Sequence, residues 1–138
     1  MLFQNPTDAE IRDILKKTRT IAVVGLSPRP ERDSHRIASF LIREGYTVFG
    51  VRPGVHQILG RPCYPRLQEV PEPVDLVDVF RRPSAVAQHA EEAIAIAART
   101  LWLQLGVVDE KAALRAAQAG LAVVMNRCIL VEHGRLLG

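Results

Sequence analysis

Short apolar runs alternate with amphipathic stretches along this chain of 138 residues. Each run has the length and the β-branched or apolar composition of a buried strand. The runs lie at residues 20–24, 47–51, 74–80, 101–105 and 121–125. The first of them ends at Gly25, which is followed by a loop rich in proline and arginine.

Helical periodicity fills most of the stretches between the apolar runs. Thr7 and Glu10 form a capping box, in which Thr7 is the N-cap and Glu10 reaches back, so a helix is expected from there to about residue 17. Asp109 is the N-cap of another helix, which Gly120 ends. This helix is predicted over residues 110–119, and further helices are predicted over 34–44, 84–99 and 129–133.

Strands that alternate with helices predict an α/β fold, here a Rossmann-like, doubly wound parallel sheet of five strands in a three-layer α/β/α arrangement. We expect the strand order 3-2-1-4-5 with right-handed crossovers. A single domain is predicted over residues 1–138, with an N-terminal helix in 1–19, a core in 20–128 and a tail in 129–138. The stretch around Gly60, Pro62 and Pro65 is predicted to be a loop with one helical turn near residues 66–69.

Composition narrows the class of protein. Aromatic residues make up only 5% of the chain, which argues against a stacking platform for nucleic acid. Cys63 and Cys128 form neither a C-x-x-C pair nor part of a histidine-rich cluster, so no disulfide and no metal site is expected, as suits a reducing cytoplasm. No secretory signal is expected, and no apolar run reaches the ~18 residues of a membrane span, so we predict no membrane association.

The residues that directly follow the strands hold most of the candidate chemistry. In a doubly wound sheet the ligand lies beyond the carboxyl ends of the strands, near the first one. Three of the 18 basic residues are lysines and the rest are arginines, several of which fall on this edge and would raise the local potential for a polyanion. The residues expected there are Gly25, Leu26, Ser27, Arg29, Arg32, Arg52, Pro53, Arg81, Arg82, Gln104, Gly106, Asn126 and Arg127.

Two details discriminate between nucleotides. Gly25 and the helix that starts at Ser34 outline a phosphate site, but the dinucleotide fingerprint G-x-G-x-x-G is missing. Arg52 stands where an acidic residue usually holds the ribose 2′-hydroxyl of NAD, and an arginine suits a phosphorylated ribose. Both NADP and coenzyme A (CoA) carry such a ribose. His35 is interpreted either as a donor to a phosphate oxygen or as a helix cap.

The order of several motifs resembles a known family, the CoA-binding domain at the N-terminus of the succinyl-CoA synthetase α-subunit. The chain is still more similar to the stand-alone bacterial CoA-binding proteins related to that domain. The matching pieces are Gly25-Leu26-Ser27 with Arg29, Pro30, Arg32 and Ser34, then Val51-Arg52-Pro53, Val77-Asp78-Val79-Phe80-Arg81, Leu101-Trp102-Leu103-Gln104-Leu105-Gly106-Val107 and Val124-Met125-Asn126-Arg127-Cys128.

The resemblance implies a CoA site along the carboxyl edge. Gly25, Ser27 and the start of the Ser34 helix would bind the pyrophosphate, and Arg52 with Pro53 would lie near the 3′-phosphorylated ribose. Residues from Phe80 through Arg81 to Arg82 would border the adenine, and Gln104, Leu105 and Gly106 would flank the pantetheine. Pro28 and Pro30 replace glycines of the synthetase loop. The synthetase's phosphorylated histidine belongs to a second domain without a counterpart in these residues, so ligase chemistry is not implied.

No residue set indicates catalysis. His56, His89 and His133 have no neighbouring carboxylate and nucleophile that would suggest a triad. Asp78, within a buried strand, is interpreted as a hydrogen-bonded structural carboxylate, and Cys128 as an inert cysteine rather than a partner for the CoA thiol.

Three functions remain in order of preference: a non-catalytic module that binds CoA or acyl-CoA, an NADP-dependent oxidoreductase or other nucleotide-binding regulator, and a nucleic-acid-binding protein. The last is disfavoured because neither an arginine-lined helix nor an aromatic platform is present. The outer helices could support a homodimer, and the sequence indicates no protein partner.

Overall fold

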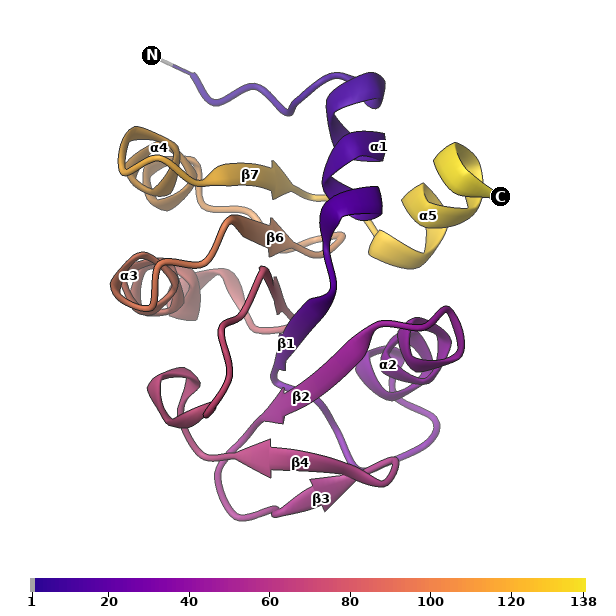
Figure 1. Cartoon of the computed structure of the whole chain (residues 1–138). Coiled ribbons are helices and arrows are strands. Elements are labelled where there is room, and N and C mark those ends of the chain that lie inside the picture. The colour runs from indigo at the N-terminus through magenta and orange to yellow at the C-terminus, as the bar shows by residue number, and fades with distance from the viewer. Residues whose placement is uncertain (1) are drawn as a thin grey trace.

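A computed structural model describes residues 2–138 of the chain. It contains five α-helices and seven strands within those residues, in the alternation that the sequence predicts (Figure 1). The helices are α1 (Asp8–Lys17), α2 (Asp33–Arg43), α3 (Val86–Ala95), α4 (Glu110–Gln118) and α5 (Ile129–Leu137). The strands are β1 (Thr20–Val24), β2 (Thr47–Val51), β3 (Gln57–Ile58), β4 (Arg61–Tyr64), β5 (Leu76–Val79), β6 (Thr100–Leu103) and β7 (Ala122–Met125). Single 3-10 turns lie at η1 (Leu67–Glu69) and η2 (Pro83–Ala85).

The seven strands form one sheet in the order β3-β4-β2-β1-β5-β6-β7. All neighbours are parallel except β3, which pairs antiparallel with β4. The α/β class and the parallel core are therefore confirmed. From β1 the chain adds β2 and β4 on one side, and later β5, β6 and β7 on the other, so the strand order reverses between β1 and β5. The crevice beyond the carboxyl ends of these two strands is the place where such a fold binds ligands.

The predicted five-strand order is wrong in one respect. The third predicted strand, now β5, pairs with β1 rather than lying outside β2, and β4 occupies the place next to β2. The stretch predicted to be a loop contains both β3 and β4. Strands of two and four residues, one of which includes Pro62, are too short to show a period-2 pattern in the sequence.

Two layers of helices cover the sheet. Helices α3 and α4 pack on one face (Figure 1). One buried apolar cluster there includes Ala90 and Ala113 of the helices and Val77 and Leu101 of the strands. Helices α1, α2 and α5 cover the other face, over a core that includes Ile21 and a fully buried Trp102. Helix α5 lies beside α1, so the first and last helices of the chain are neighbours on this face.

The predicted helix signals are confirmed by the contacts at the caps. The Thr7 N–H donates to Glu10 Oε1 at 2.8 Å and the Glu10 N–H donates to Thr7 Oγ1 at 3.2 Å, which completes the capping box. Asp109 Oδ1 accepts from the Ala112 N–H at 3.0 Å. Helix α3 ends earlier than predicted because Ala97, at φ +58°, turns the chain toward β6. No helix within residues 2–138 is both long and apolar enough to span a membrane.

Candidate functional site

The backbones of three strand ends meet at Gly25. Its N–H donates to the Val51 carbonyl at 2.9 Å, and the Phe80 N–H donates to the Val24 carbonyl at 2.9 Å. Gly25 has φ +86°, and a β-carbon at this position would collide with the carbonyl oxygen of Phe80. Glycine is therefore required here both by the backbone conformation and by the close approach of the chain after β5.

Two adjoining hollows open at this point. The larger is a cleft of about 610 Å³ and the smaller has about 440 Å³. Gly25, Arg52 and Phe80 line both, so the hollows are parts of one site. The cleft is further lined by Ser27, Arg29, Glu31, Arg32, Asp33 and Ser34, and the smaller hollow by Val51, Pro53 and Arg81.

Positive charge without a partner surrounds these hollows. Within residues 2–138, no acidic side chain lies in ion-pair distance of Arg32, Arg52, Arg81 or Arg82. Arg29 has one loose pair, at 3.6 Å from Nε to Glu31 Oε2. Unpaired guanidinium groups at a concave surface attract polyanions and can form bidentate contacts with phosphate.

The loop from Gly25 to Ser34 is held by its own polar groups. The Ser27 N–H donates to Ser34 Oγ at 2.9 Å, and the Arg29 N–H donates to Ser27 Oγ at 3.1 Å. His35 Nδ1 lies 2.9 Å from the carbonyl oxygen of Ser27. No side chain caps the first turn of α2. The His35 N–H donates to the Arg32 carbonyl at 3.1 Å, whereas the N–H groups of Asp33 and Ser34 have no partner within residues 2–138. This loop, called the phosphate loop below, thus ends at an uncapped helix N-terminus suited to an anion.

Several residues expected at the edge lie outside the two hollows. Leu26 is buried in the core beneath the phosphate loop, and Arg82 is exposed beside the site. Gln104 is buried, whereas Leu105 is 70% exposed, and the Gly106 N–H donates to Asn126 Oδ1 at 2.7 Å. These residues after β6 therefore form a separate part of the carboxyl edge, next to the start of α5.

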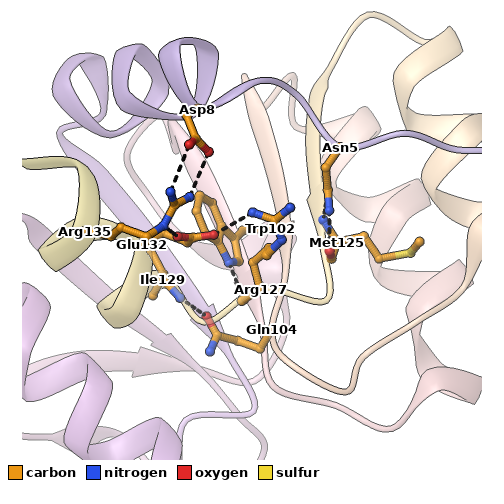
Figure 2. A network of polar contacts seen from close by, with 9 residues as sticks. All are labelled: Asn5, Asp8, Trp102, Gln104, Met125, Arg127, Ile129, Glu132 and Arg135. Atoms are coloured by element: carbon orange, nitrogen blue, oxygen red, sulfur yellow. Dashed lines mark hydrogen bonds and ion pairs between the residues drawn. The ribbon is translucent and has the colours of Figure 1, made fainter.

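Gln104 and Arg127 are not among the residues that line the hollows, and Figure 2 shows the contacts that they make instead. Gln104 Oε1 accepts from the Ile129 N–H at 3.1 Å, and Arg127 Nη1 lies 2.6 Å from Glu132 Oε1. The Trp102 indole donates to the Arg127 carbonyl at 2.9 Å, which fixes the chain between β7 and α5. Gln104 and Arg127, which the sequence predicts on the ligand edge, therefore hold α5 instead.

Glu31 and Asp33 are lining residues that the sequence reading did not include. They alternate with the arginines of the loop, and Asp33 forms an ion pair with Arg36 in the first turn of α2. Asp33 lies in the first turn of α2, where an acidic residue complements the helix dipole, and that preference was the available signal for it. Their charge reduces the net positive charge of the cleft.

Asp78 lies two residues before Phe80 on β5 and is completely buried. Neither of its carboxyl oxygens has a hydrogen-bond partner among residues 2–138, so the prediction of a hydrogen-bonded carboxylate is wrong. Burial raises the pKa of this carboxyl group well above its usual value, because the charged form is not solvated. Asp78 is not one of the residues that line the hollows.

Comparison with known proteins identifies the fold around this site. A family model described as a CoA binding domain matches residues 19–134 of the chain. The chain belongs to the CoA-binding domain family. The resemblance expected from the motifs is confirmed, as is the Rossmann-like architecture.

Three relatives show how far this similarity extends. The protein YneT of Bacillus subtilis (strain 168) is 40% identical over 131 residues, which cover 95% of this chain and 97% of YneT. A solved structure of a hypothetical protein from Pyrococcus horikoshii OT3 is 39% identical, with a TM-score of 0.93 and coverage of 100% of both chains. An ADP-forming acetate–CoA ligase of Archaeoglobus fulgidus is 35% identical over 74 residues, which cover 54% of this chain and 11% of the ligase. Family members thus occur both at this length and as part of a longer enzyme.

Proposed function

We propose that this chain binds CoA, free or as an acyl-CoA, through the 3′-phospho-ADP part of the ligand and without a chemical step of its own. The observation that supports this mode is the cleft at Gly25, where unpaired arginines and an uncapped helix N-terminus lie together in a member of the CoA-binding domain family. Its position beyond β1 and β5 is the usual ligand position of a doubly wound sheet.

The parts of the ligand match the parts of the site by their chemistry. The pyrophosphate carries its charge on oxygens that accept hydrogen bonds, and the first turn of α2 supplies N–H donors and a positive dipole end. Arg52 borders both hollows and would contact the 3′-phosphate, since a guanidinium group can form two hydrogen bonds with it. Phe80 also borders both hollows and would pack against the adenine, and the pantetheine would leave past Leu105 and Gly106.

The hydroxyl groups in the cleft support a binding role rather than catalysis. A serine nucleophile requires a general base in hydrogen-bond reach of its hydroxyl. Ser27 Oγ and Ser34 Oγ instead accept hydrogen bonds from backbone N–H groups of the phosphate loop. Both hydroxyls therefore stabilise the shape of the loop and keep their own protons to donate to a phosphate oxygen.

Isothermal titration with CoA, 3′-dephospho-CoA and NADPH tests the proposal. We expect CoA to bind more tightly than 3′-dephospho-CoA, and Arg52→Ala to weaken CoA binding by about 10- to 100-fold through loss of a charge-assisted contact. The same substitution should change the affinity for 3′-dephospho-CoA much less, because the partner phosphate is then absent.

Arg12→Ala is the matched control, since Arg12 is exposed on α1 and has no ion pair within residues 2–138. It should leave CoA binding unchanged. Tight NADPH binding without CoA binding would instead favour the second candidate function, an NADP-dependent oxidoreductase, for which Arg52 at the end of β2 is the favouring observation.

A further inference from the structure

We infer that His35 is a positioning residue of the phosphate loop, which acts by holding the Ser27 carbonyl and does not itself contact the ligand. This inference rests on the proposed CoA site. The sequence left two roles open for His35, a donor to phosphate or a helix cap. The positioning role replaces both of them.

The contact that supports the inference is the one between the imidazole and Ser27. A carbonyl oxygen can only accept a hydrogen bond, so His35 Nδ1, at 2.9 Å from it, carries the hydrogen and donates. Because this nitrogen is occupied, it is not available to a phosphate oxygen. His35 is also absent from the residues that line the two hollows.

Pro28 explains why the Ser27 carbonyl needs a donor. The peptide group between Ser27 and Pro28 has no N–H, so its one polar atom is the carbonyl oxygen. A carbonyl oxygen turned toward the cleft would repel the phosphate oxygens and could offer them no hydrogen bond. The imidazole holds this oxygen on the side of α2 and satisfies it at the same time.

The other two polar groups of Ser27 are arranged in the same network. Its N–H donates to Ser34 Oγ and its Oγ accepts from the Arg29 N–H. Ser27 is 8% exposed and Ser34 is 5% exposed, so these bonds are largely protected from water. Loss of the His35 contact would leave the Ser27 carbonyl without a donor and loosen the loop around it, so the Ser27 and Ser34 hydroxyl groups that line the cleft would be less firmly positioned.

Substitution of His35 by two amides and by alanine distinguishes positioning from direct contact. The side-chain amide of asparagine can place an N–H near the position of Nδ1, whereas that of glutamine places it near Nε2. We expect His35→Ala to weaken CoA binding by about tenfold, because the loop loses one hydrogen bond and must then be ordered when the ligand binds. His35→Asn should retain an affinity within about threefold of the unsubstituted chain, and His35→Gln should resemble His35→Ala.

Amide hydrogen exchange in the free protein provides a second readout. The Arg29 N–H should exchange faster in the alanine and glutamine variants and at the original rate in the asparagine variant. His56→Ala is the matched control, because His56 is exposed and makes no side-chain hydrogen bond within residues 2–138; it should change neither readout. Thermal melting of each variant establishes a titration temperature at which it is folded.

Three results would overturn the inference. If His35→Ala binds CoA as well as the unsubstituted chain does, the carbonyl needs no donor. If His35→Gln retains affinity and His35→Asn loses it, Nε2 contacts the ligand directly. If the unsubstituted chain itself does not bind CoA, the proposed function fails and this inference fails with it; the first two results leave the proposed function intact.

Discussion

At the scale of single residues, solvent-accessible arginines and a buried carboxyl group lie close together at the carboxyl edge of the sheet. Arg52 and Arg81 line a hollow open to solvent, whereas Asp78, on the strand that ends beside them, is sealed from solvent with no partner for either carboxyl oxygen in residues 2–138. A buried, unpaired carboxylate is costly, so this group is most stable in its protonated form. Asp78 thereby imposes a pH dependence on folding that the exposed arginines do not.

The pKa of Asp78 is raised in the folded protein, so the folded state binds a proton that the unfolded chain has already lost. The free energy of unfolding therefore falls as the pH rises from the unfolded pKa toward the folded one. We expect Asp78→Asn, which has a neutral side chain at every pH, to unfold at higher urea concentration than the unsubstituted chain at pH 8. The difference should diminish toward pH 4.

Urea denaturation at a series of pH values measures this effect. Asp13→Asn is the control, because Asp13 is an exposed carboxylate that pairs with Lys17 at 3.0 Å. It should change stability by less than about 0.5 kcal/mol. Equal stability of Asp78→Asn and the unsubstituted chain across the pH series would show that the carboxyl group finds a partner in solution.

At the scale of secondary-structure elements, a network of side-chain contacts holds α5 in place. Glu132, with its side chain 5% exposed, lies 2.6 Å from Arg127 Nη1 and 2.7 Å from Arg135 Nε (Figure 2). Arg135 in turn contacts Asp8 at 2.8 Å and so joins α5 to the first turn of α1. The Asn5 amide pairs with both backbone groups of Met125, which holds the segment before α1 against β7.

Glu132→Gln tests this network. The pKa of Glu132 is lowered, chiefly by the hydrogen bond from Arg135 and to a smaller extent by the one from Arg127, although burial opposes this shift. Its contribution to stability is therefore present above the unfolded pKa and lost as the pH falls through the folded one. We expect the substitution to lower the free energy of unfolding by about 1–3 kcal/mol at pH 7, and by less near pH 3.

Glu91→Gln is the matched control for Glu132→Gln. The Glu91–Arg115 pair also bridges two helices, α3 and α4, but both side chains are more than half exposed. Its removal should cost less than about 1 kcal/mol, because water screens exposed pairs. A loss as large as that in Glu132→Gln would mean that burial does not determine the strength of these pairs.

On the scale of the whole molecule, charge is distributed unevenly. The formal net charge is only +3, yet Arg32, Arg52, Arg81 and Arg82, which have no acidic partner within residues 2–138, lie together near the ends of β1, β2 and β5. Elsewhere many arginines are paired, as Arg115, Arg127 and Arg135 are. The local potential at the cleft is therefore greater than the net charge suggests, and screening by salt should affect ligand binding more than it affects folding.

We accordingly expect the affinity for CoA to fall steadily as NaCl is raised from about 50 to 500 mM, because salt screens contacts between exposed charges. The double substitution Arg81→Ala and Arg82→Ala should weaken binding at low salt and reduce the steepness of this dependence. Titration of both proteins across the salt series provides the measurement. An affinity that is independent of salt would indicate that the phosphates do not lie among these arginines.

Local patterns account for what could be predicted. The capping box at Thr7, the cap at Asp109 and the apolar runs of the central strands depend on residues close in the sequence, and all appear in the structure. The loop after Gly25 and the helix that follows it could be predicted, because a glycine after a buried strand, followed by a helix, is itself a local signal. The motifs at Gly25, Arg52 and Phe80 indicated the family for the same reason.

Sequence by itself therefore determined the fold class, the family and which strand ends bear the arginines. Only the tertiary structure decided the place of β4 beside β2, the withdrawal of Gln104 and Arg127 to hold α5, and the lack of a partner for Asp78. The pairing of β4 with β2 and the contact of Gln104 with Ile129 join residues that are well separated in the sequence, and a pattern of neighbouring residues does not record which of them will meet. His35 is the instructive intermediate, since its place at a helix start was evident while its partner, Ser27, was not.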